Sequence, residues 1–383
     1  MRDMATPESP IRLEVREAKG GKRLAIATLD APKSLHALTL EMIRLLDGAL
    51  QRWAADPSIV CVVLQSSTDK AFCAGGDVRS LRDAILAEPN EMPNTTAQTF
   101  FSEEYRLDHR IHTYAKPVLV WGGGIVMGGG LGLMAGASHR VVTETTRIAM
   151  PEISIGLFPD VGASWFLPRM RGRCGLFLGL TGAPLNARDA LFTELADYVI
   201  LQADREKVIE ALCQADWHAR CAAGTTLDQV LRRYPAPAAA LPVSAVLANF
   251  DAIQALTEPS ALADVVAAIC AYEGNEPWLQ RAAKTLSKGS PFSASLTWEM
   301  QDRARHLGLA DVFRLELIVA LRCCAHADFS EGVRALLIDK DNAPRWQPAA
   351  LDDIDASAIE HCFTPPWPQH PLADLDQAPW PTT

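Results

Sequence analysis

The chain has 383 residues, 49% of them hydrophobic and 21% charged, and its formal net charge is −10. This length predicts two structural units and a large core, because domains commonly contain about 100–200 residues. The negative charge argues against nucleic acid as a partner, since binding of phosphates requires a basic face. A run of about 18 uncharged apolar residues is absent from the sequence, so we expect no membrane partner.

Cysteine usage and the first residues indicate a cellular compartment. The nine cysteines contain no CxxC pair, which favours free thiols in a reducing compartment. The first seven residues lack the apolar segment of a secretory signal. The sequence therefore predicts a cytoplasmic protein.

The N-terminal half alternates strand-like and helical patterns. Thr39 is a candidate N-cap for a helix that ends before the Asp56-Pro57 pair. Short apolar runs predict strands at 24–29, 59–64, 118–121, 140–142 and 147–150. From about residue 193 to about residue 337 helical spacing dominates, and prolines cluster after Thr364, so we expect that tail along the surface. The pattern predicts an α/β fold followed by helices.

Glycine-rich and acidic residues meet in three short segments, 71–77, 127–132 and 150–160. Taken singly, glycines after a strand are more often turn or packing residues. Backbone N–H groups at a helix N-terminus, however, are unpaired and carry the positive end of the helix dipole. Two such groups, one from each glycine loop, can bind the oxyanion that develops on a thioester carbonyl.

Other glycine-dependent or nucleophilic sites fit less well. A P-loop requires Gly-Lys-Ser/Thr and a serine hydrolase requires GxSxG, and neither occurs. Residues 130–135 match the dinucleotide fingerprint GxGxxA, but they lie well beyond the end of the preceding strand. His109 and His112 have no Cys/His cluster to complete a site, so we expect no metal.

The three segments together resemble the crotonase (enoyl-CoA hydratase/isomerase) superfamily. Segments 71–77 and 127–132 look like its two oxyanion-hole signatures, in the usual order, and 32–38 is similar to its loop beside coenzyme A. The resemblance implies a ββα spiral with two roughly perpendicular sheets and a mostly helical C-terminal region. The expected units are a spiral core at 12–200, a helical region at 201–365 and a proline-rich tail at 366–383.

Two positions distinguish branches of this superfamily. Hydratases carry a first catalytic glutamate just after the glycine run, where this chain has Gly132, and commonly a glycine where it has Asp160. Residues 150–162, 101–105 and 328–346 are similar to the 3-hydroxyisobutyryl-CoA hydrolase branch. This resemblance implies hydrolysis of a short 3-hydroxyacyl-CoA, in valine breakdown, with 3-hydroxypropionyl-CoA as a second substrate. Coenzyme A is then part of the substrate, and no separate cofactor is expected.

The resemblance also implies residue roles. Glu152 acts as nucleophile or as general base, and Asp160 holds water or the substrate hydroxyl and raises the pKa of Glu152 by like-charge proximity. The remaining expected site residues are the oxyanion donors Gly76 and Gly129, and the substrate contacts Glu104, Ala37, Leu38, Lys33 and Lys70.

Structural and functional alternatives stay open at this point. Glu152 can instead cap a helix, and Asp160 can form an Asx-turn. Another crotonase-fold enzyme, such as a hydratase or isomerase that uses Glu152 alone, remains an alternative. So does an acyl-CoA-binding member without turnover. The superfamily favours trimers and hexamers, which makes a homo-oligomer a possible state.

Overall fold

The computed structural model describes residues 9–89, 91–217 and 223–377. A six-stranded sheet forms its first layer, in the order β1-β2-β3-β5-β7-β9. β1 is antiparallel to β2, and each further pair is parallel. Its strands are β1 Ile11–Ala18, β2 Lys22–Leu29, β3 Ile59–Ser66, β5 Val118–Gly122, β7 His139–Val142 and β9 Tyr198–Val199.

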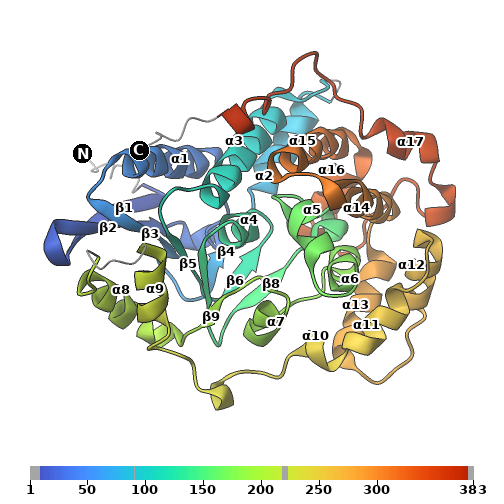
Figure 1. Cartoon of the computed structure of the whole chain (residues 1–383). Helices are drawn as coiled ribbons and strands as arrows, with labels where there is room; N and C mark the ends of the chain where they lie inside the picture. Colours follow the sequence, from blue (N-terminus) through green and yellow to red (C-terminus); the bar gives the residue numbers. More distant parts are fainter. Residues whose placement is uncertain (1–8, 90, 218–222, 378–383) are drawn as a thin grey trace, which may run out of the picture.

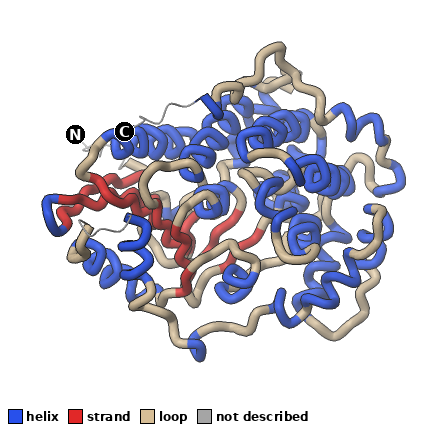
Figure 2. Tube along the Cα trace, in the orientation of Figure 1, coloured by secondary structure: helices blue, strands red, loops and turns tan. Residues whose placement is uncertain are grey.

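A second, three-stranded parallel sheet has the order β4-β6-β8. Along the chain, each of β3, β5 and β7 is followed directly by one of these short strands and then by helical turns. The repeated ββα unit forms the spiral that the resemblance implied, and Figure 2 shows its strands enclosed by helices. The short strands are β4 Ala71–Cys73, β6 Ile125–Met127 and β8 Arg147–Ala149.

The central strands are buried on both faces, as the apolar run at 59–64 predicted. Successive side chains of a strand point to opposite faces. Val62 and Leu64 accordingly join the main core, whereas Cys61 and Val63 join a second core. Helices α8 (Arg205–Cys213) and α9 contribute to that second core and cover the outer face of the sheet (Figure 1).

The helices of the spiral core begin where the sequence indicates. The Thr39 side chain accepts a hydrogen bond from the Met42 N–H and caps α1, and Asp77 caps α2 in the same way. These two helices and α3 pack beside the two sheets (Figure 1). The helices of this part are α1 Leu40–Ala55, α2 Val78–Ala87, α3 Thr95–His112, α4 Gly129–Ala135, α5 Ala163–Phe166, α6 Cys174–Thr181 and α7 Ala187–Phe192.

From α8 to α17 the described residues are mostly helical, as their spacing predicted, and they pack back onto the spiral. α15 packs against α3, and α16 packs against α2 and against the short 3-10 helix η3 (Glu152–Ile155). The helices after α8 are α9 Ala223–Leu231, α10 Ala245–Ala248, α11 Phe250–Thr257, α12 Leu262–Cys270, α13 Pro277–Lys288, α14 Pro291–Arg303, α15 Leu309–Ala325, α16 Ala327–Val333 and α17 Ala356–His361.

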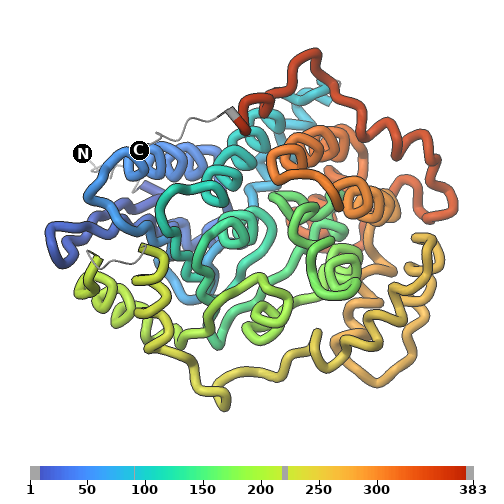
Figure 3. Tube along the Cα trace, in the orientation of Figure 1, coloured from blue at the N-terminus to red at the C-terminus, as the bar shows by residue number. Residues whose placement is uncertain are grey.

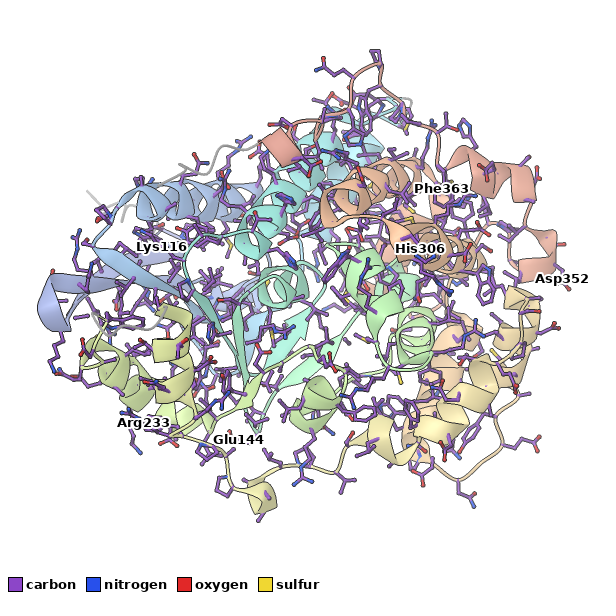
Figure 4. The ribbon with its side chains drawn as sticks, in the orientation of Figure 1. Lys116, Glu144, Arg233, His306, Asp352 and Phe363 are labelled. Atoms are coloured by element: carbon purple, nitrogen blue, oxygen red, sulfur yellow. The ribbon has the colours of Figure 1, made fainter. Side chains whose placement is uncertain are left out.

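The last described segment is anchored over α3 and α15. It is red in Figure 3 and runs along the upper edge of the molecule from α17 back toward α3. Asp374 pairs with Arg106 of α3 at 2.8 Å, and Leu372 is fully buried. Where this segment begins, the Arg303 guanidinium lies 3.8 Å from the ring centroid of Phe363, which Figure 4 labels. The tail therefore restrains the helix that carries Glu104.

Candidate active site

Two glycine loops meet at one cavity. Gly75 and Gly76 follow β4, and the Gly75 backbone lies at φ +105°, a conformation that favours glycine. A Cβ atom on Gly75 would lie 3.4 Å from the Met127 carbonyl oxygen, which places this loop against the glycines that follow β6. The two predicted oxyanion loops are thus side by side.

Among the described residues, no backbone hydrogen bond has the Gly76 N–H group as its donor. The Leu38 N–H donates to the Gly75 carbonyl at 2.8 Å, and the Leu38 carbonyl accepts from the Asp77 N–H at 2.8 Å. These bonds bracket Gly76 and do not engage its own N–H group. Gly129 is the first residue of α4, where an N–H group has no partner within the helix. Gly76 and Gly129 both line the cavity, so the structure places two backbone N–H groups at its wall.

Three buried acids face these loops. Glu104 lies on α3, Glu152 begins η3, and Asp160 follows η3 in the loop before α5. Their exposed fractions are only 2%, 4% and 4%, respectively. Glu104 Oε1 and Glu152 Oε2 have no hydrogen-bond partner among the described residues. Free oxygens of this kind are available to water or to a substrate hydroxyl.

The Tyr105 hydroxyl distinguishes Asp160 from the other acids. It donates a hydrogen bond of 2.6 Å to Asp160 Oδ2. Burial raises the pKa of Asp160 to about 6, and the Tyr105 hydrogen bond opposes this rise. Burial, and secondarily the charge of Asp160, raises the pKa of Glu152 well above its ordinary value. The predicted like-charge effect on Glu152 is present, but burial is the larger cause.

The cavity has a volume of about 220 Å³ and suits a short acyl group. It brings together five of the predicted residues, Gly76, Glu104, Gly129, Glu152 and Asp160. Its apolar wall comes from the loops, from α3 and from the π-helical turn Arg334–Ile338 near the C-terminal end of the chain. The apolar lining includes Phe100, Phe101, Leu157, Leu336 and Leu337.

The remaining predicted contacts lie outside this cavity. Lys33 and Lys70 are exposed, Lys33 in the turn Pro32–Ser34 and Lys70 just before β4. Leu38 is buried, and its side chain would approach a Cβ on Gly129 to 3.2 Å. Ala37 is partly buried, and its N–H donates to the Ser34 carbonyl. Contacts of these four residues with coenzyme A stay predictions.

Sequence reasoning missed Glu316, which fixes the loop that carries Asp160. Its side chain on α15 accepts hydrogen bonds from the Gly162 N–H at 2.8 Å and from the Ser164 N–H at 2.9 Å. Immediately before these anchors, Val161 holds φ +54°, which is unfavourable for a β-branched residue. Strain of this kind persists where the surroundings enforce it, often at functional sites. The only signal for Glu316 is an acid within the apolar run of α15.

Comparisons with known proteins agree with the resemblance of the three glycine-rich and acidic segments to this superfamily. The sequence pattern of the family described as enoyl-CoA hydratase/isomerase matches residues 24–363. The chain belongs to this family. It is 37% identical to the mitochondrial 3-hydroxyisobutyryl-CoA hydrolase of Danio rerio, over 92% of this chain and 89% of that protein. The Homo sapiens protein of the same name is 34% identical, over 88% and 85%.

Two solved structures share the fold over nearly the whole chain. A carnitinyl-CoA dehydratase from Mycobacterium thermoresistibile matches with a TM-score of 0.81 and 32% identity, over 93% of this chain and 97% of that chain. An enoyl-CoA hydratase from Rhodobacter sphaeroides matches with a TM-score of 0.79 and 34% identity, over 92% and 97%. The predicted crotonase fold is therefore confirmed.

The cytoplasmic location predicted from the sequence is wrong by this comparison, because the curated relatives are named as mitochondrial proteins. The prediction relied on the lack of an apolar leader, whereas mitochondrial transit peptides are amphipathic and basic. Within residues 9–89, 91–217 and 223–377, no helix is long and apolar enough to cross a membrane. In the same ranges, no cluster of three or more His, Cys, Asp or Glu residues has the geometry to hold a metal ion.

Proposed function

We propose that the protein hydrolyses short 3-hydroxyacyl-CoA thioesters, with 3-hydroxyisobutyryl-CoA as the main substrate and 3-hydroxypropionyl-CoA as a second one. The observation that carries this proposal is the small cavity in which two free backbone donors face three buried acids. Curated relatives with the hydrolase name support the reaction class. The pathway that this substrate implies is valine breakdown.

The oxyanion donors and Glu152 have different roles in the reaction. The N–H groups of Gly76 and Gly129 stabilise the negative charge on the thioester oxygen, and loss of one such donor costs about 3–4 kcal/mol. Glu152 either attacks the carbonyl to give a mixed anhydride or takes a proton from the attacking water. In both routes a C–O bond forms at the acyl carbon, the C–S bond breaks, and the thiolate leaves with a proton; in the nucleophilic route, water then cleaves the anhydride and frees the acid and Glu152. Single turnover in ¹⁸O-labelled water tests for the nucleophilic route, because an unlabelled Glu152 oxygen reaches the product only when water attacks the Glu152 carbonyl of an anhydride.

Glu104 gives the site its preference for a hydroxylated acyl group. Its free Oε1 lies in the same cavity, and burial raises its pKa, as does the charge of Asp160. A buried polar group that binds a substrate hydroxyl discriminates strongly against an analogue without that hydroxyl. We expect wild type to release thiol much faster from 3-hydroxyisobutyryl-CoA than from isobutyryl-CoA.

The variant Glu104→Ala tests this role directly. It should lose the preference for 3-hydroxyisobutyryl-CoA, mainly through a higher KM for the hydroxylated substrate. An undiminished preference in the variant would show that another group binds the hydroxyl.

Hydration of an enoyl-CoA is the second candidate, because the two solved structures named above are called a dehydratase and a hydratase. Against it stands Gly132, which offers no side chain at the position of a hydratase's first glutamate. The two reactions are distinguished by products, since a hydrolase frees coenzyme A thiol and a hydratase does not. Crotonyl-CoA hydration without thiol release from any hydroxyacyl-CoA would overturn the proposed function.

A further inference from the structure

Asp108 is a buried carboxyl group that the chemistry above does not use. It lies on α3, four residues after Glu104, and its exposed fraction is 2%. Neither of its carboxyl oxygens has a hydrogen-bond partner among the described residues. Burial of an unpartnered carboxyl group costs free energy, so its presence calls for a functional explanation.

The carboxyl groups of Glu104 and Asp108 both lie against glycines of α4. A Cβ on Gly129 would lie 2.2 Å from Glu104 Oε1, and a Cβ on Gly132 would lie 2.8 Å from Asp108 Oδ2. Residues four apart on one helix are neighbours on its surface. The two acids thus form a short row between α3 and α4, and only glycine at 129 and 132 leaves room for it.

This row ends at a second cavity. Asp108 lines a space of about 280 Å³ on the other side of Val161, and Val161 lines both this space and the catalytic cavity. His112, whose pKa is lowered by burial, also lines the second cavity. The charged or titratable groups around Asp108 are Glu104 and His112 on α3, Cys73 on β4, Asp160 before α5, Glu316 on α15, and the cavity-lining Arg140, Arg169 and Glu194.

Thioester hydrolysis creates a proton that must leave the catalytic cavity. Water adds to the carbonyl carbon, the C–S bond breaks, and one proton of the water goes to the thiolate. The carboxylic acid product then ionises and releases a second proton into a cavity lined by buried acids. Burial raises the pKa of Asp108 well above its ordinary value, and the charges of Glu104, Asp160 and Glu316 add to this rise. Burial and these neighbouring charges therefore favour the protonated form of Asp108.

We propose that Asp108 is a proton-relay residue that takes the product proton from the catalytic cavity and releases it to water in the second cavity. A protonated carboxyl group suits this task, because one oxygen accepts a proton while the other releases one. The net step moves one proton per turnover and needs no co-reactant other than water. This inference rests on the proposed hydrolysis.

The test compares Asp108→Asn with wild type, because asparagine keeps the shape of the side chain and cannot relay a proton. We expect kcat to fall about tenfold, less than the ~10²-fold of a group that acts on the substrate, since water replaces part of the relay. KM should stay unchanged and the solvent deuterium isotope effect on kcat should increase. In Asp108→Ala, which leaves space for a small acid, added formate should restore kcat in proportion to its concentration.

The matched control is Glu103→Gln on the same helix, since Glu103 pairs with Arg44 at the surface. It should change neither kcat nor the isotope effect. An Asn variant with wild-type kcat and isotope effect would overturn the relay, as would a loss of kcat in Asp108→Ala that formate does not restore. If wild type releases no thiol, the proposed function fails, and infrared spectroscopy of the ligand-free protein still decides on Asp108. A protonated-carboxyl band at neutral pH that disappears in Asp108→Asn supports the buried acid, and its absence from wild type refutes it.

Discussion

Replacement of Tyr105 by phenylalanine is expected to move the acid side of the pH–activity profile to higher pH. The Tyr105 hydroxyl donates a hydrogen bond of 2.6 Å to Asp160 Oδ2 inside the core, and this bond favours the ionised carboxylate. The role expected for Asp160, which is to hold water or the substrate hydroxyl as a hydrogen-bond acceptor, is served by its ionised form. Loss of the donor raises the pKa of Asp160 above about 6, so activity must appear only at higher pH.

The size of the shift follows from the strength of the bond. A hydrogen bond to a charged group contributes about 1.5–3 kcal/mol. One pKa unit corresponds to about 1.4 kcal/mol, which predicts a shift of about one to two pH units in kcat/KM. The assay is thiol release from 3-hydroxyisobutyryl-CoA across the acid range in both proteins.

Tyr114→Phe is the matched control for this prediction. The Tyr114 hydroxyl donates a hydrogen bond of 2.6 Å to the Leu50 carbonyl. This bond has the same length and involves no acid of the site. This control should lower stability by about 1 kcal/mol and leave the profile in place. The reasoning would be refuted if the acid side of the pH–activity profile did not shift in Tyr105→Phe, or if it shifted equally in Tyr114→Phe.

Two further predictions concern the loops around the cavity. Gly129→Ala places a Cβ 2.2 Å from Glu104 Oε1 and should lower kcat about 10²–10³-fold. The control is Gly48→Ala in α1, where the nearest contact of the added Cβ is at 3.4 Å. It should raise stability by about 0.5–1 kcal/mol without a change in kcat. Equal kcat in both variants would contradict the oxyanion geometry. Burial, with the charge of Asp160, raises the pKa of Glu316 from 4.5 to about 8, so its contribution to stability is complete below 4.5 and is lost as pH rises through about 8. The melting temperature should therefore fall less between pH 4.5 and about 8 in Glu316→Gln than in wild type. An equal fall in both proteins would exclude this role.

Local patterns predicted much of the fold. The Thr39 cap and the apolar runs that became β3 and β5 carry their signals in a few adjacent residues. β1 gave no such signal, because it is an edge strand whose Leu13 and Val15 are 39% and 43% exposed. In the second sheet, β8 lies within the strand predicted at 147–150, whereas β4 and β6 are too short for any periodicity.

The candidate site was predictable only in part. Motifs located the glycine loops, Glu152 and Asp160, since each belongs to a contiguous segment. The support of Asp160 was not predictable, because Glu316 lies 154 residues beyond Gly162, to which it is bonded. Asp108 gave no signal either, since an acid on a helix is ordinarily solvated and only the packing of α3 on α4 buries it.

The most direct test of the account is free-thiol release from 3-hydroxyisobutyryl-CoA by wild type and by Glu152→Gln, measured beside hydration of crotonyl-CoA. The account predicts rapid thiol release by wild type, loss of that release in the variant with the fold retained, and no hydration by either protein. Hydration without thiol release, or undiminished thiol release in Glu152→Gln, would contradict it.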